Sequence, residues 1–169
     1  MAAIFAYTCS CCGKRHEGSP SFGYAAPLYY EQLTHDEKNL ATLSGDLCKI
    51  AHPGGTDYFA RAVLEIPVTG VTEPFSWGVW VSLSEASYER YTSTWKDHDE
   101  SDSYFGWFSN QLPYYPDTTK LKTQVRPRKG GIRPYLVLED TEHLLANHFH
   151  NGIAVEEAQK IAEIAMHGS

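Results

Sequence analysis

The chain has 169 residues and a formal net charge of -7, and hydrophobic residues make up 42% of it. This apolar fraction supports a folded core and excludes an intrinsically disordered protein. The negative charge argues against nucleic acid and membrane surfaces as partners, and no apolar run approaches the roughly 20 residues that span a bilayer. Residues 1–4 lack the basic start of a signal peptide, so we expect a cytoplasmic protein with a protein or small-molecule partner.

The first third of the chain is predicted to contain short elements around a turn. From the N-terminus, the pattern indicates a strand, an irregular loop, two short helical pieces and a second strand, over residues 4–8, 17–30, 28–43 and 47–51. We interpret residues 1–169 as one domain, in which residues 1–26 form a metal-binding knuckle packed on the main body.

The clearest strands form a hairpin in the middle of the chain. Residues 58–68 alternate, and one face carries Tyr58, Ala60, Ala62, Leu64 and Ile66. After a turn at 69–72, the buried face of the next strand is predicted to consist of Phe75, Trp77, Val79 and Val81. The short connection favours an antiparallel pair.

The remaining pattern predicts strands followed by helices. Residues 82–85 match a capping box, which predicts a helix to about residue 95. Three strands are then expected over 104–108, 120–125 and 132–138. Two helices follow, the first capped by Asp140 or Thr141 and ending at Asn151-Gly152, the second running over about 155–166. Without a βαβ rhythm, this order predicts an α+β domain: an antiparallel sheet with flanking helices and an N-terminal zinc-knuckle-like turn.

The most informative stretch is residues 9–16, Cys-Ser-Cys-Cys-Gly-Lys-Arg-His. The C-x-x-C spacing of Cys9 and Cys12 lets two thiolates converge on one tetrahedral ion, and His16 and the distant Cys48 complete a Cys₃His zinc site. Cys11 is a spare thiol that could replace His16. Three cysteines in four positions are poorly placed for disulfides, so we expect reduced thiols. The alternatives are unliganded cysteines in a surface turn or a redox pair, although no thioredoxin-like βαβ unit surrounds the motif.

A second candidate site uses the aromatic belt between residues 77 and 115. Trp80 projects beside Gly78, where a flat ring could form the floor of a ligand groove. The ligand-binding residues predicted on this basis are Arg61, Trp80, Trp107, Arg133 and His143. Buried aromatic packing is the competing explanation, and the basic segment 120–133 also fits a solvated pair of strands. Because no catalytic motif occurs, we expect a binding protein more than an enzyme.

Several motifs together resemble one bacterial family, the domain of unknown function numbered 2199. They are Cys9-Ser-Cys-Cys12-Gly13, Asp46-Leu47-Cys48, the segment 59–67 around Arg61, the segment 77–83 around Trp77 and Trp80, Phe105-Gly106-Trp107, Leu112-Pro113, Arg133-Pro134 and residues 143–153. The resemblance covers nearly the whole chain and implies a small bacterial cytoplasmic protein in which Cys9, Cys12, His16 and Cys48 belong to one pattern. The family carries no established activity. The chain departs from its pattern over residues 144–149.

These observations lead to one hypothesis and two alternatives. The hypothesis is a domain stabilised by structural zinc that acts in protein or ligand binding. One alternative is an immunity-type protein that neutralises another protein through an acidic, aromatic-rich surface. The other is a small-molecule enzyme with a pocket near Trp80, Arg61 and His143.

Overall fold

The computed structural model describes residues 4–168; residues 1–3 of the predicted knuckle, and with them most of the segment tested for a signal peptide, lie outside the described part, as does Ser169. The strands are β1 (Ala6–Thr8), β2 (Arg15–Glu17), β3 (Ser21–Gly23), β4 (Ala41–Leu43), β5 (Leu47–His52), β6 (Gly55–Ile66), β7 (Phe75–Leu83), β8 (Tyr104–Phe108), β9 (Lys122–Arg126) and β10 (Tyr135–Leu138). The helices are α1 (Leu28–Glu31), α2 (His35–Asn39), α3 (Glu85–Ser93), α4 (Leu144–Asn151) and α5 (Val155–His167).

Five strands close into a barrel. β6, β7, β8, β9 and β10 pair antiparallel in chain order, and β10 then pairs with β6 in parallel through Tyr135 and Val63. In an antiparallel series of five strands, the first and the last run in the same direction, so the seam that closes the barrel must be parallel. The mixed α and β content was predicted correctly, and the antiparallel sheet was predicted in part: most of its pairings are antiparallel, but the sheet closes on itself and two pairings are parallel.

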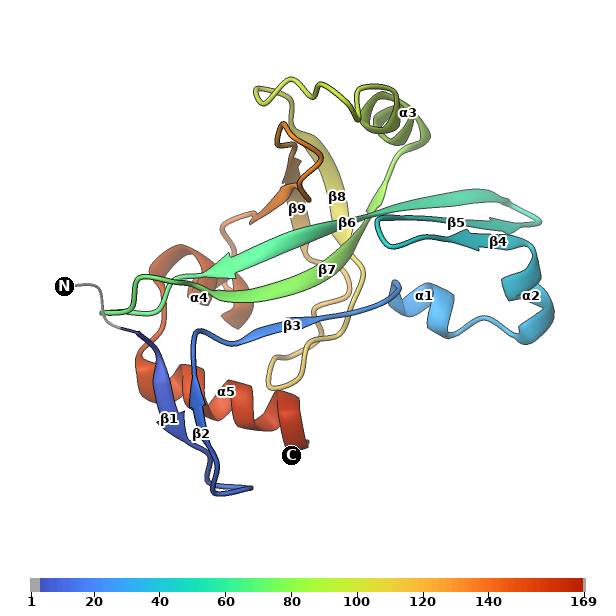
Figure 1. The fold of residues 1–169 in the computed structure, drawn as a ribbon. Coiled ribbons are helices and arrows are strands. Elements are labelled where there is room, and N and C mark those ends of the chain that lie inside the picture. The colour runs from blue at the N-terminus through green and yellow to red at the C-terminus, as the bar shows by residue number, and fades with distance from the viewer. Residues whose placement is uncertain (1–3, 169) are drawn as a thin grey trace.

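The first half of β6 extends beyond the barrel and carries a wing. It pairs there with β5, which pairs with β4. β3 lies outside the wing: it pairs in parallel with the first half of β7, at the opposite end of the β6–β7 hairpin. Figure 1 shows this wing, with α1 and α2 beside it, on the side of the barrel away from β1, β2 and α5. The cysteine motif and the wing therefore lie at opposite ends of the molecule.

The core is divided in the same way. The main cluster fills the barrel and includes the predicted strand faces, with Leu64, Trp77 and Val79 all at most 1% exposed. It continues under α4 and α5, and the N-terminal segment adds Tyr7 of β1 and Phe5, which directly precedes β1. A second cluster lies on the outer face of β5, β6 and β7 and consists of Cys48, Ile50, Phe59 and Trp80.

Most predicted elements agree with the structure, and the differences concern their ends. The helix expected after residues 82–85 begins at Glu85 because the hydroxyl of Ser84, not Ser82, accepts a hydrogen bond from Ser87 N at 3.1 Å. α4 is capped by His143 and not by Asp140 or Thr141. The sequence prediction missed β2, β3 and β4, each three residues long. No helix in the described range 4–168 is long and apolar enough to cross a membrane.

Candidate metal centre

The β1–β2 hairpin presents the cysteine motif at its tip. Cys9 N donates to Lys14 O at 2.8 Å and Gly13 N donates to Cys9 O at 2.9 Å, which closes the turn around the motif. Gly13 has a φ of +71°, a conformation that glycine adopts without steric cost. The turn holds Cys9 buried and leaves Cys12 exposed.

The C-terminal helix docks one face against this turn. Gln159, Glu163 and His167 are spaced four residues apart, so they share the face of α5 that points at the hairpin. Glu163 Oε1 accepts from Ser10 N at 2.8 Å and its Oε2 accepts from Ser10 Oγ at 2.6 Å. The hydrogen bonds from Ser10 and Gln159 lower the pKa of Glu163 to about 2. Gln159 also donates to Thr8 O at 3.3 Å.

One turn beyond Glu163, His167 completes a cluster of three candidate ligands. The sulfur atoms of Cys9 and Cys12 and a ring nitrogen of His167 all lie within 4.8 Å of one another, and Cys9 Sγ is 3.3 Å from His167 Nε2. Ligand atoms of a tetrahedral zinc are separated by about 3.3–3.8 Å, given Zn–S and Zn–N bonds of about 2.3 and 2.0 Å. Small movements of these three side chains would therefore bring their ligand atoms to the separations that one zinc ion requires.

The electrostatics of Cys9 also suit a metal ligand. Burial acts to raise the pKa of this thiol, but hydrogen bonds from the backbone N–H groups of Cys12 and Cys11 act in the opposite direction, and the pKa lies below its ordinary value. Since the metal ligand is the thiolate, the turn favours the form that binds.

His16 stands at the edge of the cluster. Its Nε2 is 3.8 Å from Cys12 Sγ, although it does not belong to the group whose atoms all lie within 4.8 Å. Its ring also packs on Tyr7, with the centroids 5.2 Å apart. His16 is thus the nearest candidate for a fourth ligand, while Cys11 is exposed and outside the cluster.

The structure separates Cys48 from the cluster, which corrects the predicted ligand set. Cys48 lies on β5, opposite Leu43 on one side and Phe59 on the other, and its side chain is buried in the second core cluster. Burial raises the pKa of its thiol to about 11, so it behaves as a small core residue. Figure 1 places β5 in the wing, far from the β1–β2 hairpin.

The residues that sequence reasoning missed are Glu163 and His167. Their spacing of four on an amphipathic helix was a usable signal, because it placed a carboxylate and an imidazole on one face. Nothing in the sequence connected this pair with the cysteine motif, since 158 positions separate Cys9 from His167.

The second predicted site does not form as expected. Trp80 is fully buried, and its indole Nε1 donates to Tyr24 O at 2.9 Å. His143 caps α4, its Nδ1 accepting from Leu145 N at 3.0 Å, and its Nε2 lies 2.9 Å from Asp117 O. Both rings are therefore occupied by structural contacts, and Trp80, Arg61 and His143 do not line the groove that Trp107 lines.

The two predicted arginines meet the loop between β4 and β5. Arg133 Nε donates to Asp46 Oδ1 at 2.9 Å, and Arg61 Nη1 donates to Gly45 O at 3.4 Å. A Cβ added at Gly23 would lie 2.8 Å from Arg61 Nη2, so the missing side chain there leaves space for the guanidinium. These arginines hold the wing to the barrel.

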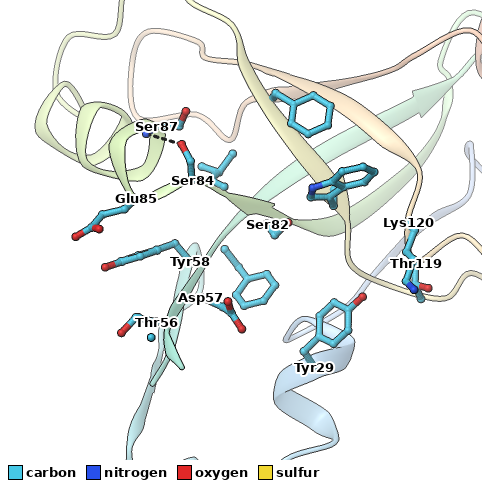
Figure 2. A pocket seen from close by; sticks show the side chains of 15 residues that line it. Tyr29, Thr56, Asp57, Tyr58, Ser82, Ser84, Glu85, Ser87, Thr119 and Lys120 are labelled. Atoms are coloured by element: carbon cyan, nitrogen blue, oxygen red, sulfur yellow. Dashed lines mark hydrogen bonds between the residues drawn. The ribbon is translucent and has the colours of Figure 1, made fainter. Parts of the chain in front are cut away.

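Trp107 does line a groove, at a different place. The groove has a volume of about 990 Å³ and lies over the outer faces of β6, β7 and β8, with Tyr29 of α1 at one edge. Figure 2 shows Asp57 and Glu85 on one side of it and Lys120 with Thr119 on the other. Of the five predicted ligand-binding residues, only Trp107 belongs to this groove.

Comparison with protein-family models now identifies the chain. Residues 8–153 match the model of the family DUF2199, described as "Uncharacterized protein conserved in bacteria". The protein belongs to this family. The match includes Cys9, Cys12 and His16 but ends before α5, so Glu163 and His167 lie outside it. Comparisons with curated proteins and with solved structures give no match.

Proposed function

We propose that this DUF2199 protein is a zinc-stabilised binding protein, in which one structural zinc ion joins the N-terminal hairpin to the C-terminal helix. The observation that carries the proposal is the convergence of Cys9 Sγ, Cys12 Sγ and a ring nitrogen of His167 within 4.8 Å. Two thiolates and imidazole are the donors that zinc prefers in proteins.

His16 supplies the fourth ligand in this proposal. Its distance of 3.8 Å from Cys12 Sγ is close to the separation expected of two ligands on one ion. A Cys₂His₂ shell from three elements, the turn, β2 and α5, leaves no open position for substrate. The role of the metal is accordingly structural, and the protein acts by binding a protein or small-molecule partner in the cytoplasm, not by catalysis at zinc.

Zinc content and affinity in matched variants test the ligand set. We expect the wild-type protein to hold about one zinc per chain, and His167→Ala to bind it more than about 100-fold more weakly, because loss of a second-shell contact alone typically costs 10–100-fold. Cys48→Ala is the control and should retain wild-type zinc affinity. His16→Ala tests the role of His16. Zinc affinity falls if His16 is the fourth ligand and stays unchanged if its ring only packs on Tyr7.

The measurement is elemental analysis of purified protein together with competition against a chelator. Full zinc affinity in His167→Ala would remove α5 from the site. A loss of zinc in Cys48→Ala, in protein that remains folded by circular dichroism, would restore the ligand set predicted from the sequence.

A further inference from the structure

The groove that contains Trp107 is built from one row of side chains across neighbouring strands. The register pairs Phe59 with Ser82 and Ser82 with Trp107, and Trp107 with Lys122 on the next strand. Between the two aromatic rings stands the small side chain of Ser82. The outer face of the barrel is therefore lower at Ser82 than on either side, and the depression has aromatic walls.

The walls are held by contacts within the protein. Tyr29 stacks on Phe59 with ring centroids 6.0 Å apart, and Phe105 packs edge-on against Trp107 at 5.1 Å. Tyr29 is positioned because the segment before α1 is fixed to the core, where Asn110 Nδ2 donates to Ala26 O at 3.0 Å. The groove is thus formed before any ligand arrives.

These rings are unusually open to solvent for their size. Tyr29, Phe105 and Trp107 are 36%, 41% and 44% exposed, whereas Trp77 and Trp80 are at most 1% exposed. Exposed aromatic rings gathered around one depression are typical of binding sites for flat ligands, since stacking and apolar burial both favour association.

The two ends of the groove carry opposite charge. Asp57 and Glu85 line one end, where Asp57 Oδ2 is 3.3 Å from His52 Nε2. Lys120 lines the other end, and Lys122 stands beside Trp107. Among the ion pairs formed by residues 4–168, neither lysine has a carboxylate partner. Figure 2 shows Asp57 and Glu85 across the groove from Lys120.

From this arrangement we propose that the groove binds a small molecule with a planar ring between a hydrogen-bond-donating or cationic end and an anionic end. The ring lies over Ser82 between Trp107 and Tyr29, the exposed ring that covers Phe59. Its donors face Asp57 and Glu85, and its anionic group faces Lys120 and Lys122. Mononucleotides and aromatic dipeptides both have this chemistry, and a volume of about 990 Å³ accommodates either. The proposal rests on the binding role proposed above but not on zinc.

Fluorescence titration distinguishes these sources. The probes are AMP, CMP, GMP, UMP, adenosine, the dipeptide Phe-Gly, and inorganic phosphate alone. Among the four tryptophans, Trp107 is the most exposed to solvent, so a ring stacked on it quenches emission. If the ligand is a nucleotide, the three nucleotides with an exocyclic amino group should bind more tightly than UMP. If it is a peptide, Phe-Gly should bind and the nucleotides should not.

Variants then locate the site. Trp107→Ala should weaken binding about 5- to 150-fold, which corresponds to about 1–3 kcal/mol for a stacked base. Tyr135→Ala removes a ring of similar exposure, 40%, on β10 outside the groove, and is the matched control. Lys120→Ala should weaken binding of AMP but not of adenosine. For Trp107→Ala, binding is read by calorimetry.

These experiments test binding in the groove independently of the proposed zinc site. His167→Ala should leave binding in the groove unchanged, so a protein without zinc that still binds a probe supports the groove alone. The proposal is overturned if wild-type protein binds neither class of probe, or if Tyr135→Ala weakens binding as much as Trp107→Ala.

Discussion

At the scale of single residues, the protein uses histidine in two opposite ways. His167 is exposed and aligned with two thiols, as a metal ligand requires, whereas His148 is 4% exposed and has no such neighbours. The Nδ1 of His148 lies 2.8 Å from Tyr115 Oη, and its Nε2 lies 3.0 Å from Glu157 Oε1. Neutral His148 satisfies both contacts by accepting from the tyrosine and donating to the carboxylate.

The burial of His148 predicts acid sensitivity. Burial lowers the pKa of His148 and the neighbouring Glu157 only partly opposes this, so the folded pKa lies below the ordinary value of about 6.5. The unfolded chain then binds the proton first, and the free energy of unfolding falls as pH drops below about 6.5. We expect the urea midpoint to decrease from pH 7.5 to pH 5, and the decrease to be smaller in His148→Gln.

His98 contributes an effect of the same sign, because burial lowers its pKa as well. The control is therefore His98→Gln, which should remove its own share of the pH dependence and leave that of His148. Equal pH dependence in wild-type protein and His148→Gln would show that His148 does not titrate on unfolding.

At the scale of elements, alternation predicted what lies inside the barrel but not that a barrel forms. The alternating positions of β6 and β7 face the interior, as expected from their apolar period of two. Closure depends instead on Val63 N, which donates to Pro134 O at 2.9 Å across 71 positions of chain, and on one parallel register pair. Neither contact requires a particular residue type at these positions, so the sequence pattern predicted an open sheet.

Gly106 in β8 offers a test of barrel packing. A Cβ at this position would lie 2.6 Å from Ser82 O and 3.3 Å from Val81 Cβ on the neighbouring strand. Because backbone atoms cannot move aside cheaply, Gly106→Ala should reduce the free energy of unfolding by about 1–3 kcal/mol. Chemical denaturation monitored by circular dichroism measures this.

Gly45→Ala is the matched control, since a Cβ there meets nothing within 4 Å. It should leave the free energy of unfolding within about 0.5 kcal/mol of wild type. If both substitutions cost the same, the close approach of β7 and β8 at Gly106 does not limit packing.

At the scale of the whole molecule, the barrel separates the candidate metal cluster from the aromatic groove. The metal cluster lies where β1, β2 and α5 meet, while the wing carries Tyr29 and the first half of β6 to the aromatic groove (Figure 1). Two members of the metal cluster, Cys9 and Cys12, were predictable, because they lie in one short motif whose chemistry is specific. The third member required knowing that α5 returns to the N-terminal hairpin, which depends on tertiary packing alone.

This separation predicts a local response to metal removal. With a chelator, backbone amides of β1, β2 and the last turn of α5 should exchange hydrogen faster, because the proposed zinc would join only these elements to each other. Amides of β6 to β9 should keep their protection, since the barrel core is apolar and independent of the cluster. Hydrogen exchange followed by mass spectrometry measures both regions in one experiment.

Uniform loss of protection across the barrel after chelation would instead show that the metal supports the entire fold. His167→Ala without chelator is the genetic equivalent and should reproduce the local pattern.

The span of 158 positions between Cys9 and His167 has a consequence for biosynthesis. Both thiols of the cluster are translated well before the imidazole of His167. In a nascent chain, Cys9 and Cys12 therefore cannot contact this imidazole until elongation has passed residue 167. Products of translation that stops earlier would lack the contact between the β1–β2 turn and α5, and their thiols would stay open to oxidation.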